Sequence, residues 1–170
     1  DFLVNVALNR DKAITRCFAG DPVAAYRAGT TFVRGTSLAS VEAPFDIVVT
    51  TNSGWPLDLN LYQAVKGMSA AARIVRPGGA IVIAAECRDG VPDHGSFGRL
   101  LRESRIPDEL LARLRSPGFA MDDQWQAHTL AIILKKAEVH VHAAGLTDVQ
   151  IAGAMLRPCP SIENRVEELQ

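Results

Sequence analysis

The chain has little of what marks a nucleic-acid-binding protein or a membrane protein. Its 170 residues balance 18 Lys and Arg against 19 Asp and Glu, for a formal net charge of -1, and basic residues stand at most in pairs. A nucleic-acid partner requires a row of cations to neutralise its phosphates. No apolar run is long enough to cross a bilayer, and no signal-peptide pattern is visible. We therefore expect neither nucleic acid nor a membrane as a partner.

Cysteine is also scarce. The 3 cysteines, Cys17, Cys87 and Cys159, lie far apart and form no C-x-x-C pair. An odd number of scattered thiols does not build a disulfide framework, so we expect buried or incidental thiols in a reducing compartment. This pattern predicts a cytoplasmic location.

The glycine and nucleophile motifs of several common enzyme classes are missing as well. The sequence contains no Walker A motif, no G-x-G-x-x-G after an apolar strand and no nucleophile elbow. The missing glycine fingerprint argues against an ordinary Rossmann-like oxidoreductase or transferase domain.

The beginning of the chain forms a segment of its own. Two apolar runs within residues 1–20 predict a β-hairpin. Asp21 as N-cap and Pro22 at the first helical position predict a helix that follows it. Because the chain starts at Asp1 and runs at once into an apolar strand, we expect it to be part of a larger protein. The pattern leaves open whether residues 1–40 pack on the rest of this chain or on an absent upstream domain.

The rest of the chain, residues 41–170, reads as one α/β domain. An apolar strand at 46–51 precedes a helix of about 58–75, begun by Asp58 or by Asn60 and ended by the Arg76-Pro77-Gly78-Gly79 run, and a second apolar strand follows at 80–87. This strand–helix–strand order predicts a right-handed parallel unit. A third strand is expected at 138–143, with further helices at 96–104, 107–115, 122–136, 147–155 and 161–169. The sequence therefore predicts an α/β fold: a three-layer, Rossmann-like domain with a mostly parallel sheet, preceded by a short hairpin and helix.

Candidate site residues follow the first strand of this domain. In open α/β sheets ligands bind outside the carboxyl ends of the strands, where the loop 52–56 is expected. Tyr62, Gln63 and Lys66 are spaced to share one face of the next helix. A lysine shielded from water loses charge readily and can act as a general acid or base, whereas an ordinary surface lysine is the interpretation that the pattern alone favours. Gln63 can hydrogen-bond a carboxylate or a hydroxyl, and Tyr62 is more typical of packing.

Histidines offer a second set of candidates. His140 and His142 alternate along a predicted strand, so they face the same side and could hold a metal ion. No third ligand stands at a suitable spacing, which favours a solvated or helix-covered strand face instead. His94, in the polar loop 88–95, is a weaker acid–base candidate but a better placed one.

One long run carries a resemblance to a known family. Residues Thr51 to Gly67 read TNSGWPLDLNLYQAVKG, which is similar to the (S/T)N-x-G-(Y/W)-P-L-D-x-N-L-Y-Q-A-x-K-G segment of the nickel-pincer lactate racemase family. Three further stretches agree in kind and order, at 2–21, 85–97 and 123–128. The chain is identified as a member of that family, and the resemblance extends over essentially all of it.

The resemblance implies a function and a division of labour. Members of the family are two-domain enzymes that invert a 2-hydroxy acid, using a nickel-pincer nucleotide that takes a hydride from the substrate carbon and returns it to the other face. The N-terminal domain carries the cofactor lysine and the nickel-ligating histidine, and nothing in this chain matches those segments. The resemblance thus implies a C-terminal, substrate-closing domain that is inactive alone and holds no cofactor itself. Its small 2-hydroxy carboxylate substrate would be one of several that the family accepts.

The resemblance also assigns residues. Gln63 and Lys66 correspond to the family's contacts with the substrate carboxylate, with Lys66 as the catalytic candidate and Tyr62 beside them, and Trp125 corresponds to a tryptophan that lines the substrate pocket. This hypothesis predicts a shallow polar surface open to a missing domain. The alternative, a stand-alone α/β module that binds a small anion without catalysis, predicts a closed pocket within the domain.

Overall fold

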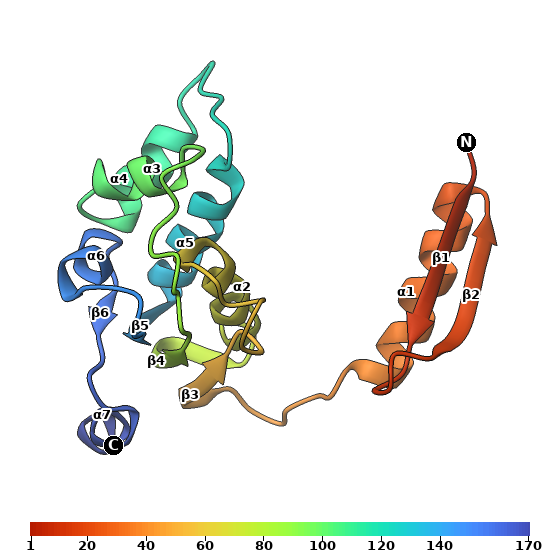
Figure 1. The fold of residues 1–170 in the computed structure, drawn as a ribbon, viewed down its shortest axis with the longest axis horizontal. Helices are drawn as coiled ribbons and strands as arrows, with labels where there is room; N and C mark the ends of the chain where they lie inside the picture. Colours follow the sequence, from red (N-terminus) through yellow and green to blue (C-terminus); the bar gives the residue numbers. More distant parts are fainter. The chain divides into compact units, whose positions relative to one another are not determined.

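A computed structural model describes the whole chain, residues 1–170. It divides into two compact units, Asp1–Glu42 and Ala43–Gln170, each of which is a separate fold (Figure 1). None of the helices combines the length and the hydropathy needed to span a bilayer.

The first unit is a hairpin covered by one helix. Strand β1 (Leu3–Leu8) pairs antiparallel with β2 (Ile14–Gly20), and α1 (Pro22–Ser37) follows. Asp21 caps α1, since its carboxylate accepts a hydrogen bond from the Ala24 amide at 2.9 Å. The helix packs on one face of the hairpin, where the rings of Phe18 and Phe32 lie 5.8 Å apart. The predicted hairpin, N-cap and helix are confirmed.

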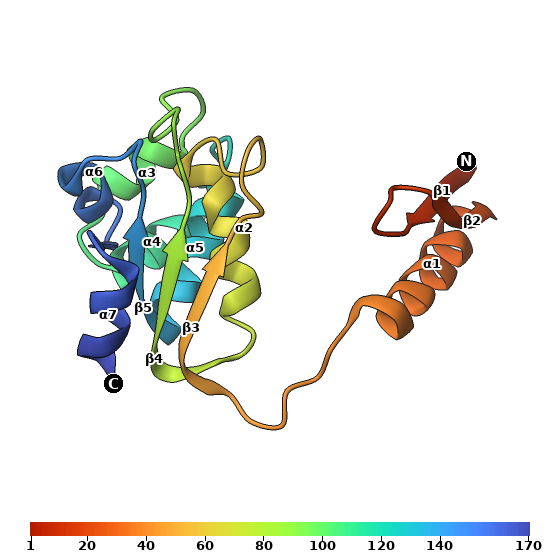
Figure 2. The ribbon, with the colours of Figure 1, turned by 60° about the horizontal axis from the view of Figure 1, so that its bottom comes forward.

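The second unit alternates strands and helices. Its sheet has 4 strands in the order β3-β4-β5-β6, and every pair is parallel. Figure 2 shows β3, β4 and β5 side by side. The elements, in chain order, are β3 (Phe45–Thr51), α2 (Leu61–Ala71), β4 (Val75–Ala84), α3 (Phe97–Arg102), α4 (Pro107–Leu114), α5 (Gln124–Lys136), β5 (Ala137–His142), α6 (Asp148–Gly153), β6 (Arg157–Pro158) and α7 (Ile162–Leu169).

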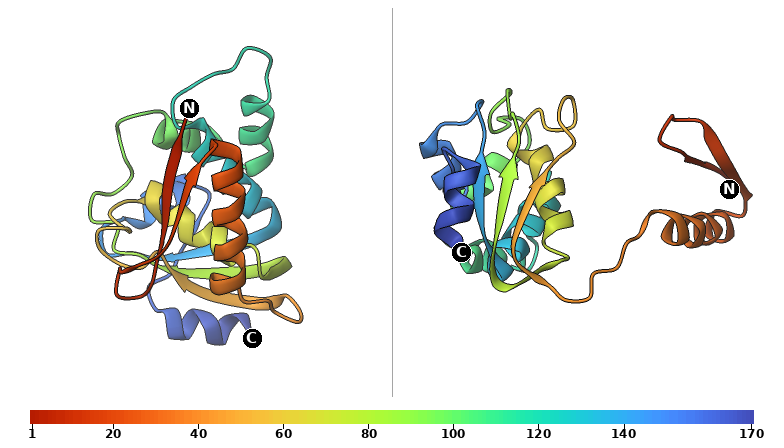
Figure 3. Two further views of the ribbon diagram at one scale, coloured as in Figure 1. Left: turned by 90° about the vertical axis from the view of Figure 1, so that its right-hand side faces the viewer. Right: turned by 90° about the horizontal axis from the view of Figure 1, so that it is seen from below.

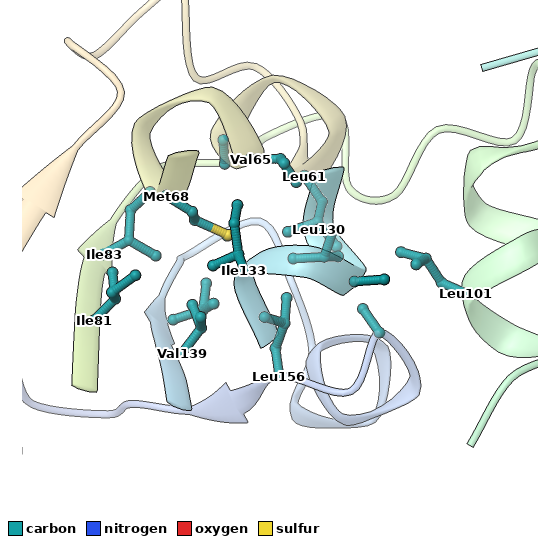
Figure 4. Close-up of a cluster of buried hydrophobic side chains, with 14 of the residues drawn as sticks. Leu61, Val65, Met68, Ile81, Ile83, Leu101, Leu130, Ile133, Val139 and Leu156 are labelled. Atoms are coloured by element: carbon teal, nitrogen blue, oxygen red, sulfur yellow. The ribbon is translucent and has the colours of Figure 1, made fainter. Parts of the chain in front are cut away.

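Helices cover both faces of this sheet. Helices α2 and α5 pack on one face and α7 lies against the other, which gives three layers (Figure 3). The central strand β4 is buried on both faces from Ala80 to Ile83, as its continuous apolar run predicts. Figure 4 shows the core between the sheet and α2 and α5, built from Leu61, Val65, Met68, Ile81, Ile83, Leu130, Ile133 and Val139. The α/β, Rossmann-like fold class is confirmed.

Of the two caps predicted for the helix after β3, Asn60 is confirmed, whereas the end of the helix was predicted wrongly. Helix α2 begins at Leu61, after Asn60 rather than Asp58, because the Asn60 side chain accepts a hydrogen bond from the Gln63 amide at 3.1 Å. It ends at Ala71, and the run that was expected to terminate it, residues 76–79, lies inside β4 instead. The pairing of β3 with β4 shifts in register between Phe45 and Ile47, so β4 accommodates its Pro-Gly-Gly run as an irregularity.

Strand β6 was not predicted. It contains only Arg157 and Pro158, which pair with His140 and Val141 at the edge of the sheet. A proline lacks an amide hydrogen and is tolerated at such an edge, so the local sequence reads as an interruption rather than as a strand.

His140 is a buried ionisable side chain of the sheet, with only 2% of its surface exposed. Burial first, and the positive charge of Arg165 next, lower the pKa of its imidazole from the ordinary 6.5, although Glu138 opposes this. A lowered pKa in the folded state means that the unfolded chain binds the proton more readily.

The contribution of His140 to the free energy of unfolding is therefore expected to be constant above about pH 7 and to fall as the pH drops below the unfolded-state pKa of 6.5. Urea titrations of the wild type and His140→Leu between pH 5 and 8 would measure this dependence. The variant should show a flatter profile, and His128→Leu, on an exposed position of α5, should keep the wild-type profile. An equally steep profile in His140→Leu would contradict the assignment.

Candidate functional site

The candidate site lies at the carboxyl ends of the parallel strands. Thr51 of β3, Ala84 of β4 and His142 of β5 stand in register in neighbouring strands, where each of these strands ends. The loops that follow β3 and β4 emerge at the same end of the sheet (Figure 2). Backbone hydrogen bonds join these loops, from Asp89 N to Leu59 O at 2.8 Å and from Leu61 N to Gly90 O at 3.0 Å. The segment that leads from β3 into α2 is therefore held in place by the loop after β4.

Asp58 anchors the segment between β3 and α2. Only 5% of it is exposed, its Oδ2 accepts a hydrogen bond from the Glu86 amide at 3.0 Å, and its carbonyl accepts one from the Cys87 amide at 3.0 Å. Burial, reinforced by the Asp58 charge, raises the pKa of the Cys87 thiol to about 12. Asp58 therefore ties the loop after β3 to the loop after β4 and does not cap the helix.

Helix α2 lies unusually close to β3 at Gly67. A Cβ atom added to Gly67 would stand 2.6 Å from the Thr51 carbonyl oxygen, so a side chain is not accommodated there. Gln63 lies one turn before Gly67 and is half-buried, whereas Lys66 is exposed and forms no ion pair. The close packing sets the position of both polar side chains relative to the end of β3.

Tyr62 packs into an aromatic cluster. Its ring lies 5.3 Å from Phe97 and 5.7 Å from Trp125, edge to face in both cases. Its hydroxyl donates a hydrogen bond to Asp123 Oδ1 at 3.4 Å. Burial, followed by the Asp123 charge and this hydrogen bond, raises the pKa of Tyr62. The Gln126 side chain donates to the Tyr62 carbonyl at 2.6 Å, which fixes α5 against the first turn of α2.

The structure thus brings Tyr62 and Trp125 into contact, although they are 63 positions apart. Trp125 remains 55% exposed, so its indole is supported from one side and open on the other. Gln63 directly follows Tyr62 in the first turn of α2, and Lys66 lies about one turn further along the helix. An ammonium and an amide on neighbouring turns of one helix can bind a small carboxylate.

A separate cleft of about 320 Å³ opens at the ends of the strands, and it is not lined by Tyr62, Gln63, Lys66 or Trp125. Its polar walls come from Asp58, Glu86 and His142. His142 is held by a contact of 2.8 Å between its Nδ1 and the Cys159 carbonyl. The sequence analysis did not predict this grouping. The three residues could have been grouped because each lies at, or in the loop after, the carboxyl end of a strand.

The histidines do not assemble a metal centre. No group of three or more His, Cys, Asp or Glu side chains is placed to hold a metal ion. His140 and His142 share the sheet face on which α7 packs, and His140 has Glu138 Oε2 at 3.6 Å from its Nε2. His94 lies exposed in the loop between β4 and α3.

The fold defines a parallel α/β domain of the Rossmann-like class, in which Trp125 contacts Tyr62 near the carboxyl ends of the strands. The chain belongs to the lactate racemase C-terminal domain family, whose model matches residues 40–169.

Similar proteins agree with this assignment. A lactate racemase of Thermoanaerobacterium thermosaccharolyticum is 43% identical over 136 residues, which is 78% of this chain and 31% of that protein. A lactate racemase of Lactiplantibacillus plantarum is 40% identical over 150 residues, 87% of this chain and 34% of that protein. The solved structure of the lactate racemase apoprotein from T. thermosaccharolyticum matches with a TM-score of 0.86 at 34% identity, over 99% of this chain and 40% of that one. The chain thus spans about a third of the length of the curated relatives it matches.

Proposed function

We propose that this chain is the substrate-closing, C-terminal part of a 2-hydroxy acid racemase or epimerase of the lactate type. The observation that carries the proposal is the contact, on an exposed surface, of Trp125 on α5 with Tyr62 on α2, the helix that also carries Gln63 and the exposed Lys66. Such a surface suits a domain that completes a site by closing over a substrate held elsewhere. It is less suited to a stand-alone module, which would enclose its ligand.

Each side chain has a task that its chemistry fits. The Lys66 ammonium and the Gln63 amide bind the substrate carboxylate and fix its orientation. The Trp125 indole, braced by Tyr62, excludes water from the substrate carbon and limits the space for its side group. Because Lys66 is exposed in this chain, it becomes shielded only when the domain closes, and its electrostatic attraction for the carboxylate then strengthens.

The cofactor in this proposal, a nickel-pincer nucleotide, is carried by the part of the racemase polypeptide outside this chain. It supplies hydride acceptance and return at the substrate carbon, while the residues described here position the substrate. The proposed location is the cytoplasm, which the unpaired state of the 3 cysteines supports.

The test is an assay of the full-length protein with L-lactate and, separately, with D-lactate and other 2-hydroxy acids. We expect interconversion of the two enantiomers of at least one of these acids, and none by the 170-residue chain alone. Calorimetry of the 170-residue chain with lactate should detect no binding tighter than about millimolar, since half of the site is missing. Tight binding by this chain, together with an inactive full-length protein, would favour the anion-binding module instead.

A further inference from the structure

The hairpin of the first unit carries an apolar face that nothing in the unit covers. Side chains alternate between the faces of a strand, and α1 packs on the face that bears Phe18. The opposite face presents Val4, at 63% exposure, and Val6, at 42%. Their cross-strand partners in β2 are Ala19 and Cys17, which are also exposed. Leu8 and Ile14, paired at the turn end of the hairpin, extend this surface.

We call this surface the far face of the hairpin: Val4, Val6, Leu8, Ile14, Cys17 and Ala19. It contains no charged side chain. A contiguous apolar surface of this kind on a small unit marks an interaction site.

The unit also lacks a core that would hold it together alone. Only Ala7 and Ala25 are buried among residues 1–42. A two-stranded hairpin is at best marginally stable in water, even with one helix on it, when so little apolar surface is removed from solvent. The far face is apolar surface that the unit leaves in solvent, so covering it would stabilise the unit.

The comparisons indicate what covers it. The C-terminal domain model begins at residue 40, beside the structural boundary between Glu42 and Ala43. The match to the solved racemase nevertheless extends over 99% of the chain. The hairpin and α1 therefore have counterparts in a lactate racemase but lie outside its C-terminal domain.

We propose that residues 1–42 are built into the other domain of the racemase, whose apolar layer buries the far face of the hairpin. The segment between α1 and β3, residues 38–44, contains no helix or strand and is then the connection on which the C-terminal domain moves. The proposal rests on the proposed function only in taking the partner to be the rest of a racemase polypeptide. Its test uses no activity, so the two can fail separately.

Cys17 lies on the far face and reports on whether that face is covered. The full-length enzyme and the 170-residue chain would be pulse-labelled with N-ethylmaleimide, and each cysteine peptide would be quantified by mass spectrometry. Cys17 is expected to label rapidly in the 170-residue chain and about 100-fold more slowly in the full-length enzyme, since labelling there requires local opening. Cys87, which is fully buried, should resist labelling in both and serves as the internal control.

A pair of variants sharpens the test. Val6→Asp places a charge on the far face, and Asn5→Asp places the same charge one residue earlier, on the opposite face of β1. In the full-length enzyme, Val6→Asp should accelerate Cys17 labelling at least about 10-fold, because a buried unpaired charge opens the interface, while Asn5→Asp should keep the wild-type rate. Equal labelling of Cys17 in the full-length enzyme and the 170-residue chain, whether fast or slow, would overturn the proposal. If Val6→Asp does not fold, the wild-type comparison still decides.

Discussion

Replacing Lys66 with alanine in the full-length enzyme is expected to lower kcat/KM for its 2-hydroxy acid by roughly 10² to 10³-fold, the range typical for loss of one preorganised donor. The ammonium is the one positive charge on the Tyr62–Lys66 turn, so the substrate carboxylate has no equivalent anchor after the change. The fold should not be affected, because Lys66 is exposed and its side chain forms no ion pair. Initial rates with both enantiomers would measure the loss.

Lys135 provides the matched control. It is also a helical lysine on the surface, and its ammonium pairs with Asp108 at 2.8 Å. An exposed pair of this kind contributes about 1 kcal/mol or less, so Lys135→Ala should retain activity within about twofold. Lys66→Arg should recover part of the lost activity, since it keeps the charge but not the shape. Wild-type rates in Lys66→Ala, with an unchanged circular dichroism spectrum, would remove Lys66 from the site.

Much of the fold could be predicted because local and long-range preferences agree. The continuous apolar run of β4 predicts a strand that is covered on both faces, and such a strand requires helices on both sides of the sheet. The residues Asp21 and Thr147 start α1 and α6 through side-chain caps that depend only on the next three residues. At such places the sequence within one turn determines the structure.

The errors occur where a distant contact overrides the local pattern. Asp58 has the chemistry of an N-cap, but its carboxylate is already engaged by the Glu86 amide, and the helix starts later for that reason. Pro77 and the glycines after it would end a helix, yet Val75 pairs with Phe45 of β3 and Gly79 pairs with Ala137 of β5, so the run between them lies within β4. Neither contact can be read from the neighbouring residues.

The candidate site, like the fold, has one part that local sequence predicts and another that depends on distant contacts. Helical spacing alone groups Tyr62, Gln63 and Lys66, and the structure keeps them within two turns of α2. The approach of Trp125 depends on how α5 packs on α2, so only the resemblance to a known family could suggest it. The grouping of Asp58, Glu86 and His142 depends on the register of three strands, and no spacing in the sequence reveals it.

Gly67→Ala is expected to cost about 2 to 3 kcal/mol of unfolding free energy, a typical penalty for overpacking a well-filled site. The added Cβ would lie 2.6 Å from the Thr51 carbonyl oxygen. That oxygen is backbone at the end of β3, where Thr51 pairs with Ala84, so it cannot turn aside as a flexible side chain would. The strain is relieved only if α2 moves away from the sheet.

A shift of α2 would displace Gln63 and Lys66 together, so the same variant should also lose activity in the full-length enzyme, by at least about tenfold. Urea unfolding of the 170-residue chain measures the stability, and Gly153→Ala is the control, because a Cβ there meets no atom within 4 Å. The control should change the unfolding free energy by no more than about 1 kcal/mol. If Gly67→Ala kept both the wild-type urea midpoint and full activity, the close contact between α2 and β3 would not be what positions the site.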